Sequence, residues 1–146
     1  MKKVLIVAAD FYWKTTSSLV VDAQLLLDKS KIKHETIYVP GVFEIPVTIS
    51  KYIKKYDGFI ALGIVIKGET PHFDFICKST FDAIMNISVS TKKPIGNGII
   101  TALNMSQAIK RSGDPEFVTD KKHLDKGKGK EAAKAVIAVL KNVPKK

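Results

Sequence analysis

The sequence is poor in the residues that build disulfides, metal centres and membrane spans. Its single cysteine, Cys77, excludes an internal disulfide and fits a reducing compartment. The three histidines and this one thiol do not have the spacing of metal ligands, so we expect no metal site. No stretch approaches the roughly 20 apolar residues that a membrane helix needs. We therefore expect a cytoplasmic protein without membrane contact.

Several well-known catalytic and nucleotide-binding motifs are also missing. No G-x-G-x-x-G follows the first apolar run, which argues against a dinucleotide site. The glycine- and lysine-rich stretch 125–131 lacks the Gly-Lys-Ser/Thr of a P-loop. No Gly-x-Ser-x-Gly is present for a serine nucleophile. Nicotinamide, nucleoside triphosphate and serine-hydrolase chemistry are thus poorly supported.

What the sequence does contain is typical of one globular domain with a basic surface. Its 146 residues are 45% hydrophobic and 26% charged, which suits a single packed domain over 1–146. The net charge is +10, with much of the surplus in residues 110–146. Such a surplus attracts phosphates or nucleic acid, although scattered lysines are equally typical of a solvated surface. Without an aromatic-basic RNA motif, we expect no nucleic-acid partner.

Apolar runs and helical periodicities alternate along the chain. This alternation predicts an α/β fold, a three-layer α/β/α sandwich with a four-stranded parallel sheet, flavodoxin-like in architecture. Thr16 or Ser17 is available as the N-cap of the first helix. A short helix is predicted over 104–113, and Gly113 is suited to ending it. Residues 114–130 are polar and are expected to be irregular. The predicted strands are 4–10, 34–40, 58–66 and 94–101, and the last helix is predicted over 131–143.

Ligands of such sheets bind beyond the carboxyl ends of the strands. Residues 10–13, 40–44 and 67–72 occupy these ends. His72 follows Thr70, a candidate helix cap, and Pro71. In the first helical turn the helix dipole disfavours a positive charge, and a neutral imidazole can accept and return a proton. The alternative is a merely exposed or structural histidine.

Three further residue types have both a functional and a structural interpretation. Arg111 is the only arginine, so its guanidinium fork is a candidate phosphate ligand; alternatively it is any cation favoured at a helix C-terminus. Glu44 either accepts hydrogen bonds from ligand hydroxyls or caps the helix that begins near Pro46. Phe11 either stacks on a planar heterocycle or belongs to the core.

Five blocks of the sequence, which extend over almost the whole chain, together resemble the lumazine synthase family. They are Phe11 after the first strand, VPGVFEIP at 39–46, GIVIKGETPHFDFIC at 63–77, NGIITALNMSQAIKRSG at 97–113 and DKGKGKEAA at 125–133. The GETPHFD block is highly specific, and several ordered blocks in one chain are much stronger than one motif.

The resemblance implies that a ribitylamino-substituted aminouracil condenses with 3,4-dihydroxy-2-butanone 4-phosphate to give 6,7-dimethyl-8-ribityllumazine, phosphate and water, without a metal or organic cofactor. It implies that His72 moves protons during Schiff-base formation. It implies phosphate contacts from Gly68, Glu69, Thr70, Arg111 and Lys126, or a lysine near Lys126. It implies pyrimidine and ribityl contacts from Phe11, Gly41, Val42, Phe43, Glu44, Ile64, Val65, Ile66 and Asn97.

The resemblance also implies a homo-oligomer with active sites shared between subunits. Two features depart from many members: Asn97 stands where they have an aromatic residue, and the stretch between Arg111 and Lys126 is long. We expect this loop, which contains Asp114-Pro115, to prevent assembly of shells and to leave a homopentamer. Two rivals remain: an archaeal-type riboflavin synthase, and a basic binding module for RNA or flavin on the same scaffold.

Overall fold

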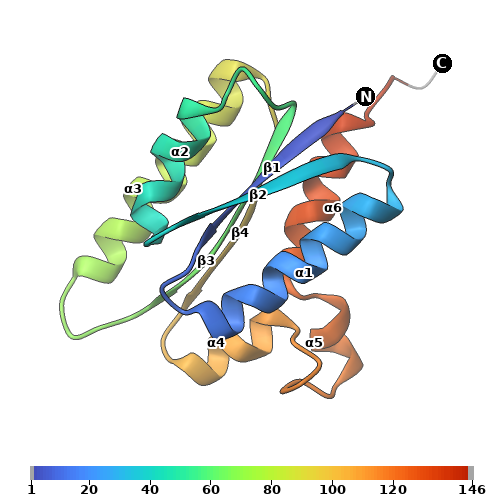
Figure 1. The fold of residues 1–146 in the computed structure, drawn as a ribbon. Helices are drawn as coiled ribbons and strands as arrows, with labels where there is room; N and C mark the ends of the chain where they lie inside the picture. Colours follow the sequence, from blue (N-terminus) through green and yellow to red (C-terminus); the bar gives the residue numbers. More distant parts are fainter. Residues whose placement is uncertain (1, 145–146) are drawn as a thin grey trace.

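The computed structural model of the chain describes residues 2–144, which form a four-stranded parallel sheet between two layers of helices (Figure 1). The strand order is β2-β1-β3-β4, and every neighbouring pair is parallel. This confirms the predicted three-layer α/β/α architecture. The strands are β1 (Lys3–Ala9), β2 (Lys33–Val39), β3 (Gly58–Ile66) and β4 (Ile95–Ala102).

The burial of each strand follows from its place in the sheet. The central strands β1 and β3 are apolar runs that are buried over nearly their whole length, because helices cover both of their faces. The residues of the edge strand β2 are exposed or half-buried, except that its last residue, Val39, is buried. The two longest helices that cover one face are α1 (Trp13–Lys29) and α6 (Lys128–Leu140), and α2 (Ile45–Lys51) and α3 (His72–Thr91) cover the other (Figure 1).

Each face of the sheet has its own apolar core, because successive side chains of a strand point to opposite faces. Val4, Ile6 and Ala8 of β1 pack into the core beneath α1 and α6. Leu5, Val7 and Ala9 of the same strand pack into the core beneath α2 and α3. The alternation along one fully buried strand therefore supplies both cores.

Short elements gather at the carboxyl ends of the strands. These are the 3-10 helix η1 (Val42–Glu44), the helix α4 (Met105–Ser112) and the helix α5 (Lys121–Asp125). Helix α4 begins with a side-chain cap, since Asn104 Oδ1 accepts from the backbone N of Gln107 at 2.9 Å. It ends, as predicted, at Gly113, whose φ of 68° lies in the left-handed region that glycine tolerates.

Two predicted helix starts were wrong. Helix α1 begins at Trp13, before Thr16 and Ser17, because the backbone oxygen of Tyr12 accepts from Thr15 N at 3.2 Å and Thr16 N at 3.0 Å. Helix α3 has Pro71 rather than Thr70 at its N-cap position. The Thr70 hydroxyl still lies at this helix start.

The prediction that 114–130 is irregular was also wrong. The stretch contains α5, which Asp120 caps by accepting from His123 N at 3.2 Å. Helix α6 begins at Lys128, three residues before the predicted start. Lys130 Nζ donates to the backbone oxygen of Leu124 at 2.8 Å, and this contact ties α5 to α6.

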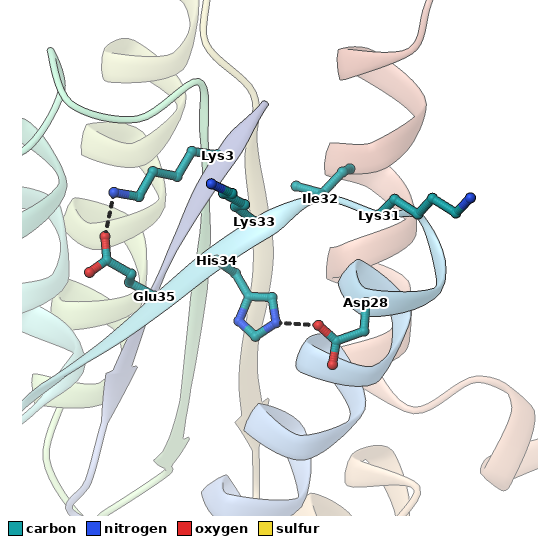
Figure 2. Close-up of a pocket in the computed structure, with 7 residues that line it drawn as sticks. All are labelled: Lys3, Asp28, Lys31, Ile32, Lys33, His34 and Glu35. Carbon is teal, nitrogen blue, oxygen red and sulfur yellow. Dashed lines mark hydrogen bonds and ion pairs between the residues drawn. The ribbon is translucent and has the colours of Figure 1, made fainter. Parts of the chain in front are cut away.

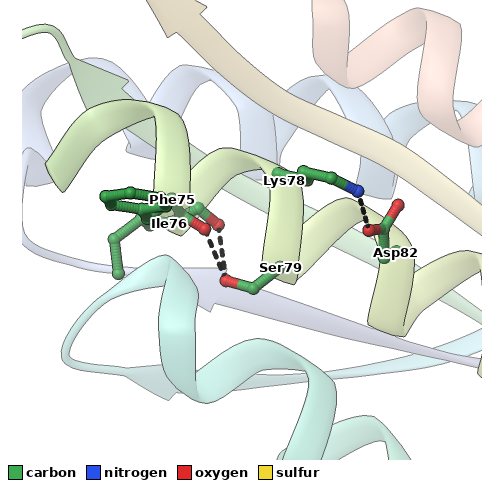
Figure 3. A network of polar contacts seen from close by, with 5 residues as sticks. All are labelled: Phe75, Ile76, Lys78, Ser79 and Asp82. Carbon is green, nitrogen blue, oxygen red and sulfur yellow. Dashed lines mark hydrogen bonds and ion pairs between the residues drawn. The ribbon is translucent and has the colours of Figure 1, made fainter. Parts of the chain in front are cut away.

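The exposed side of α3 carries local polar contacts that support the helix (Figure 3). Lys78 and Asp82 form an ion pair at 2.6 Å with the i, i+4 spacing that favours helices. The Ser79 hydroxyl donates to the backbone oxygen of Phe75 at 2.6 Å. None of the helices within residues 2–144 is long and apolar enough to cross a bilayer.

Candidate active site

A cavity of about 310 Å³ lies at the carboxyl ends of β1 and β3, beside the start of α3. It contains eight of the residues predicted to contact substrate. Its lining is apolar apart from a few groups, which is typical of a site for a flat organic ligand. The lining residues are Ala9, Phe11, Tyr12, Gly41, Val42, Phe43, Ile64, Val65, Ile66, His72 and Ile76.

The floor of this cavity depends on the close packing of η1 against β3. A Cβ on Gly63 would lie 2.7 Å from Cγ1 of Val42, which is too close for a real contact, and 3.0 Å from Cβ of Ala9, which is tighter than most. Glycine in the strand therefore allows the buried Val42 to cover the sheet. As a result, Gly41 and Phe43 are placed next to the strand ends.

Phe11 presents a free aromatic surface at the cavity. The residue is 74% exposed, whereas phenylalanine is among the residues most often buried. Its ring meets the ring of Tyr12 edge to face, with centroids 4.9 Å apart and an angle of 77°. This contact leaves a face of Phe11 open to stack on a planar ligand. Tyr12 belongs to the strand-end segment 10–13, but the sequence reasoning did not single it out as a site residue.

His72 is the first residue of α3 and is exposed at the cavity. Its backbone N donates to the Thr70 hydroxyl at 3.4 Å, while its imidazole makes no hydrogen bond to other residues in the range 2–144. A ring with both nitrogens unengaged can exchange a proton with a bound ligand. The imidazole therefore has no structural hydrogen bond within residues 2–144 and is available to a ligand in the cavity.

Glu44 does not act as a side-chain cap. It occupies the N-cap position of α2, but its carboxylate makes no capping hydrogen bond. Its Oε1 lies 3.2 Å from where a Cβ on Gly41 would be, which places the carboxylate beside the cavity wall. It does not itself line the cavity. The position still allows it to accept from a ligand that extends past Gly41.

A second hollow, of about 300 Å³, contains the only arginine. Arg111 lines it together with Asn97, Thr101, Phe81 and Lys128. The guanidinium donates to the backbone oxygen of Thr101 at 3.4 Å, which is a weak contact that leaves most of its donors available. The exposed guanidinium can therefore still bind an oxyanion through a bidentate pair of hydrogen bonds.

Asn97 lies on the edge strand β4 and is exposed. Its Oδ1 accepts from the backbone N of Ile99 at 3.0 Å. The amide nitrogen of the side chain remains free to donate into the hollow. Asn97 thus offers a hydrogen-bond donor rather than an aromatic ring to a ligand in this hollow.

Lys126 and Lys128 differ in how they approach Arg111. Both line a third hollow with it, but only Lys128 also lines the hollow that contains Asn97. Lys128 lies in the first turn of α6, where it pairs with Glu131 at 3.7 Å. Lys128 is therefore the lysine better placed beside Arg111.

The remaining predicted phosphate ligands are not brought to Arg111 within one chain. Gly68, Glu69 and Thr70 form an exposed loop before α3 and line neither the cavity nor the Arg111 hollows. No residue of the His72 cavity lines the hollow of Arg111 and Asn97. Within one chain, the His72 cavity and the hollow of Arg111 and Asn97 are therefore separate. Over residues 2–144, no cluster of three or more His, Cys, Asp or Glu side chains is arranged to hold a metal.

Comparison with known proteins shows the family of this chain. A sequence model described as 6,7-dimethyl-8-ribityllumazine synthase matches residues 1–143. Proteins of that name from Bartonella tribocorum and Cutibacterium acnes are each 39% identical over 94% of this chain, and the matches span 87% and 80% of those relatives. One from Limosilactobacillus reuteri is 42% identical over 74% of the chain and 73% of its own length. The chain therefore belongs to the 6,7-dimethyl-8-ribityllumazine synthase family.

Proposed function

We propose that the protein condenses 5-amino-6-(D-ribitylamino)uracil with 3,4-dihydroxy-2-butanone 4-phosphate to form 6,7-dimethyl-8-ribityllumazine in riboflavin biosynthesis, with release of phosphate and water. The observation that carries the proposal is the cavity that holds an exposed aromatic ring and an unengaged imidazole together. This pairing suits a flat amine whose protons must be moved during reaction. Membership of the family supports the same reaction.

The pyrimidine would bind in the apolar cavity. Its ring would stack on the open face of Phe11, while the strand end Ile64–Ile66 would line its edge. The ribityl chain would extend past Gly41, where the carboxylate of Glu44 can accept from its hydroxyls. Backbone groups of the Gly41–Phe43 turn would complete this contact.

His72 would move the protons. The amine of the pyrimidine attacks the ketone of the second substrate, and the resulting carbinolamine loses water to form a Schiff base. The amine nitrogen must lose protons and the leaving oxygen must gain one, so a neutral imidazole can serve each step in turn. Alignment of the two substrates would supply much of the rate, since positioning can contribute roughly 7–11 kcal/mol.

Arg111 would hold the phosphate of the second substrate and then release it as inorganic phosphate. Lys128 or Lys126 would add a second positive charge. The backbone at Gly68–Thr70 precedes the N-terminus of α3, on the His72 side of the proposed site. It would supply N–H donors to the phosphate from that side. Glu69 would turn its side chain away from the anion.

A complete site would then need two copies of the chain. In our proposal the Arg111 and Asn97 half of one subunit faces the His72 half of its neighbour in a homopentamer. Large apolar side chains exposed along α3 support such contacts, since Phe75, Met85 and Val89 are each more than 60% exposed. We propose that this single-domain protein acts in the cytoplasm.

The two-substrate assay tests the activity directly. Purified protein is incubated with both substrates, and the absorbance of the lumazine product is followed together with the release of phosphate. Product should appear only when both substrates are present. A second incubation with the lumazine alone should give no riboflavin, and riboflavin there would identify the rival synthase. Nucleic-acid binding without lumazine formation would support a binding module instead.

Light scattering tests the assembly. The expected mass is about five times the 16.1 kDa of one chain. A mass near that of a shell of many pentamers would contradict the proposed role of the long 114–127 connection. A monomer that is fully active would contradict shared sites.

A further inference from the structure

Asp22, in the middle of α1, is a half-buried acid that the proposed reaction does not use. Its Oδ2 atom is buried and has no hydrogen-bond partner among residues 2–144. Buried polar groups are almost always paired, so an orphaned carboxylate oxygen needs an explanation. Asp22 lines neither the His72 cavity nor the hollows around Arg111. A role in the reaction would therefore have to be indirect.

The charged neighbours of Asp22 belong to two segments that pack beside α1. Helix α6 lies alongside α1 (Figure 1), and a Cβ on Gly129 would lie 2.4 Å from the backbone oxygen of Leu19. Lys130 follows this close contact, and its positive charge acts on the Asp22 carboxyl. The negative charge of Asp114, a buried residue that follows α4, acts on it as well. The strand side chains in the core beneath α1 and α6 are apolar and add no charge.

Lys130 uses its ammonium group to hold α5. Its Nζ donates to the backbone oxygen of Leu124 at 2.8 Å, near the end of that helix. It forms no direct ion pair with Asp22, so the carboxylate acts on it through space. A nearby negative charge stabilises the charged ammonium. Because a helix of five residues is not stable alone, the order of α5 depends on such contacts.

Helix α5 in turn packs against the end of α4, which carries Arg111. A Cβ on Gly113 would lie 3.0 Å from the backbone oxygen of His123 and 2.9 Å from Cα of Gly127. The connection therefore touches the residue that ends α4. Arg111 lies in the last turn of that helix, two residues before Gly113. A continuous series of contacts thus leads from Lys130 to the helix end that directs the guanidinium.

We propose that Asp22 and Lys130 are positioning residues for Arg111, which act through α5 and the end of α4 without touching substrate. The inference rests on the proposed function, because it assigns both residues to the binding of the phosphorylated ketone. The only hydrogen bond of the Arg111 side chain within residues 2–144 is the weak one to Thr101, so the position of its helix largely directs it. A small displacement of a bidentate donor weakens its grip on an anion.

The effect of Asp22 on stability distinguishes this role from a merely structural one. Desolvation raises the pKa of Asp22, the charge of Lys130 opposes this, and the charge of Asp114 adds to it, so that the pKa lies above its usual value. The protonated carboxyl then contributes stability below the unfolded-state pKa, and this contribution is lost as pH rises through the folded-state pKa. The ionised group therefore costs stability. Asp22→Asn should not lower the urea midpoint at about pH 8, where a structural acid would.

The kinetic test compares two lysines of the same helix. We expect Lys130→Met to raise KM for the phosphorylated ketone about fivefold, with kcat and KM for the pyrimidine amine unchanged, because only the phosphate contact is displaced. Lys134→Met removes the same charge from an exposed position one turn later and should match the wild type. Lys130→Arg keeps a cationic donor and should restore most of the affinity. Circular dichroism checks that each variant is folded.

The pH dependence tests Asp22 itself. Asp22→Asn should raise KM for the ketone about threefold at about pH 8, and its ratio to the wild type should approach one as the pH falls through the raised pKa of Asp22. Taking the ratio cancels the titration of the substrate phosphate and of His72. Hydrogen exchange gives a readout without turnover, since the amides of 114–127 should exchange faster in Lys130→Met than in Lys134→Met.

Three results would overturn the inference. They are an unchanged KM for the ketone in Asp22→Asn, equal KM values in Lys130→Met and Lys134→Met, and equal hydrogen exchange of 114–127 in those two variants. A urea midpoint that falls in Asp22→Asn at about pH 8 would identify Asp22 as a structural acid instead. Wild-type protein that forms no lumazine, with the difference in hydrogen exchange intact, would contradict the proposed function and leave the contact from Lys130 to α5 supported.

Discussion

The two ends of the sheet use similar side chains in opposite ways. At the amino end, Lys3 pairs with Glu35 at 2.7 Å, and the Tyr56 hydroxyl donates to the same carboxylate at 2.7 Å. His34 pairs with Asp28 at 2.7 Å (Figure 2). The surrounding hollow, of about 410 Å³, is larger than the cavity at the other end. Most of its charges are nevertheless occupied by one another.

At the carboxyl end the corresponding groups are left open. The imidazole of His72 and the carboxylate of Glu44 have no hydrogen-bond partner among residues 2–144, and Arg111 has only its weak contact with Thr101. Volume therefore does not distinguish the two ends, whereas the engagement of the polar groups does. Paired groups stabilise the fold, and unpaired groups beside an apolar surface are available to a ligand.

Replacement of Arg111 should give the largest loss of activity. We expect Arg111→Ala to lower kcat/KM for the phosphorylated ketone about 10³-fold, since it removes two charge-assisted hydrogen bonds. Most of the change should be in KM for that substrate. Lys3→Ala is the matched loss of one cation at the amino end and should leave the kinetics unchanged. An unaltered KM for the ketone in Arg111→Ala would contradict the assignment.

Replacement of His72 should slow the reaction without abolishing it. We expect His72→Ala to reduce kcat about 100-fold, at the lower end of the roughly 10²–10⁴-fold that general acid–base catalysis typically contributes, because alignment of the substrates remains. Steady-state kinetics on both substrates measure this. His34→Ala is the control, and should leave kcat unchanged. Complete loss of turnover in a folded His72→Ala protein that still binds substrate would contradict a large contribution from substrate alignment alone.

Removal of the Tyr56 hydroxyl should affect stability alone. Tyr56→Phe deletes the hydrogen bond to Glu35 and should lower the free energy of unfolding by about 1 kcal/mol. Burial and the hydrogen bond to Glu35 raise the pKa of Tyr56 to about 12, so the hydroxyl stays protonated in ordinary buffers. Urea unfolding measures the loss, and the lumazine assay should show no change. A loss of activity would mean that the two ends are coupled.

The smallest effect should come from acid titration of the amino end. Hydrogen bonds from Lys3 and Tyr56 lower the pKa of Glu35 from 4.5. Glu35 therefore stabilises the fold at pH values above its unfolded-state pKa, and this contribution is lost as pH falls through the lower folded-state pKa. Urea midpoints of the wild type should exceed those of Glu35→Gln at pH 7 and converge with them as the pH falls through the lowered pKa of Glu35. A constant difference at all pH values would contradict the pairing.

The sequence predicted well those elements whose signals are local. The apolar run 58–66 is β3 over the predicted residues, and Gly113 ends α4 in the left-handed conformation. The start of α1 was missed because backbone bonds to Tyr12, rather than a side-chain cap, define it. Helix α5 was missed because it is short, four of its five residues are polar, and Lys130 of α6 ties it in place in addition to its cap, Asp120. Tertiary contacts of that kind leave no local pattern.

The candidate site was predictable in part for the same reason. Strand ends identify the segments that meet at one edge of a parallel sheet, and this placed Phe11, Gly41 and His72 together. The strand ends do not indicate on which side of the edge strand β4 the following helix, α4, lies. Arg111 consequently lines hollows that are separate from the His72 cavity. Lys128 lines both of these hollows with Arg111, whereas Lys126 lines only one of them. Chain order alone did not contain that information.

The hydrogen bond between the Asn97 side chain and the backbone N–H of Ile99 has a consequence for aggregation. Exposed edge strands invite an extra strand from another molecule, which leads to fibres and mispaired sheets. On β4 one of the N–H groups that such a strand would use is already satisfied by the chain itself. A strand of another molecule that adds to β4 would therefore first have to break that bond.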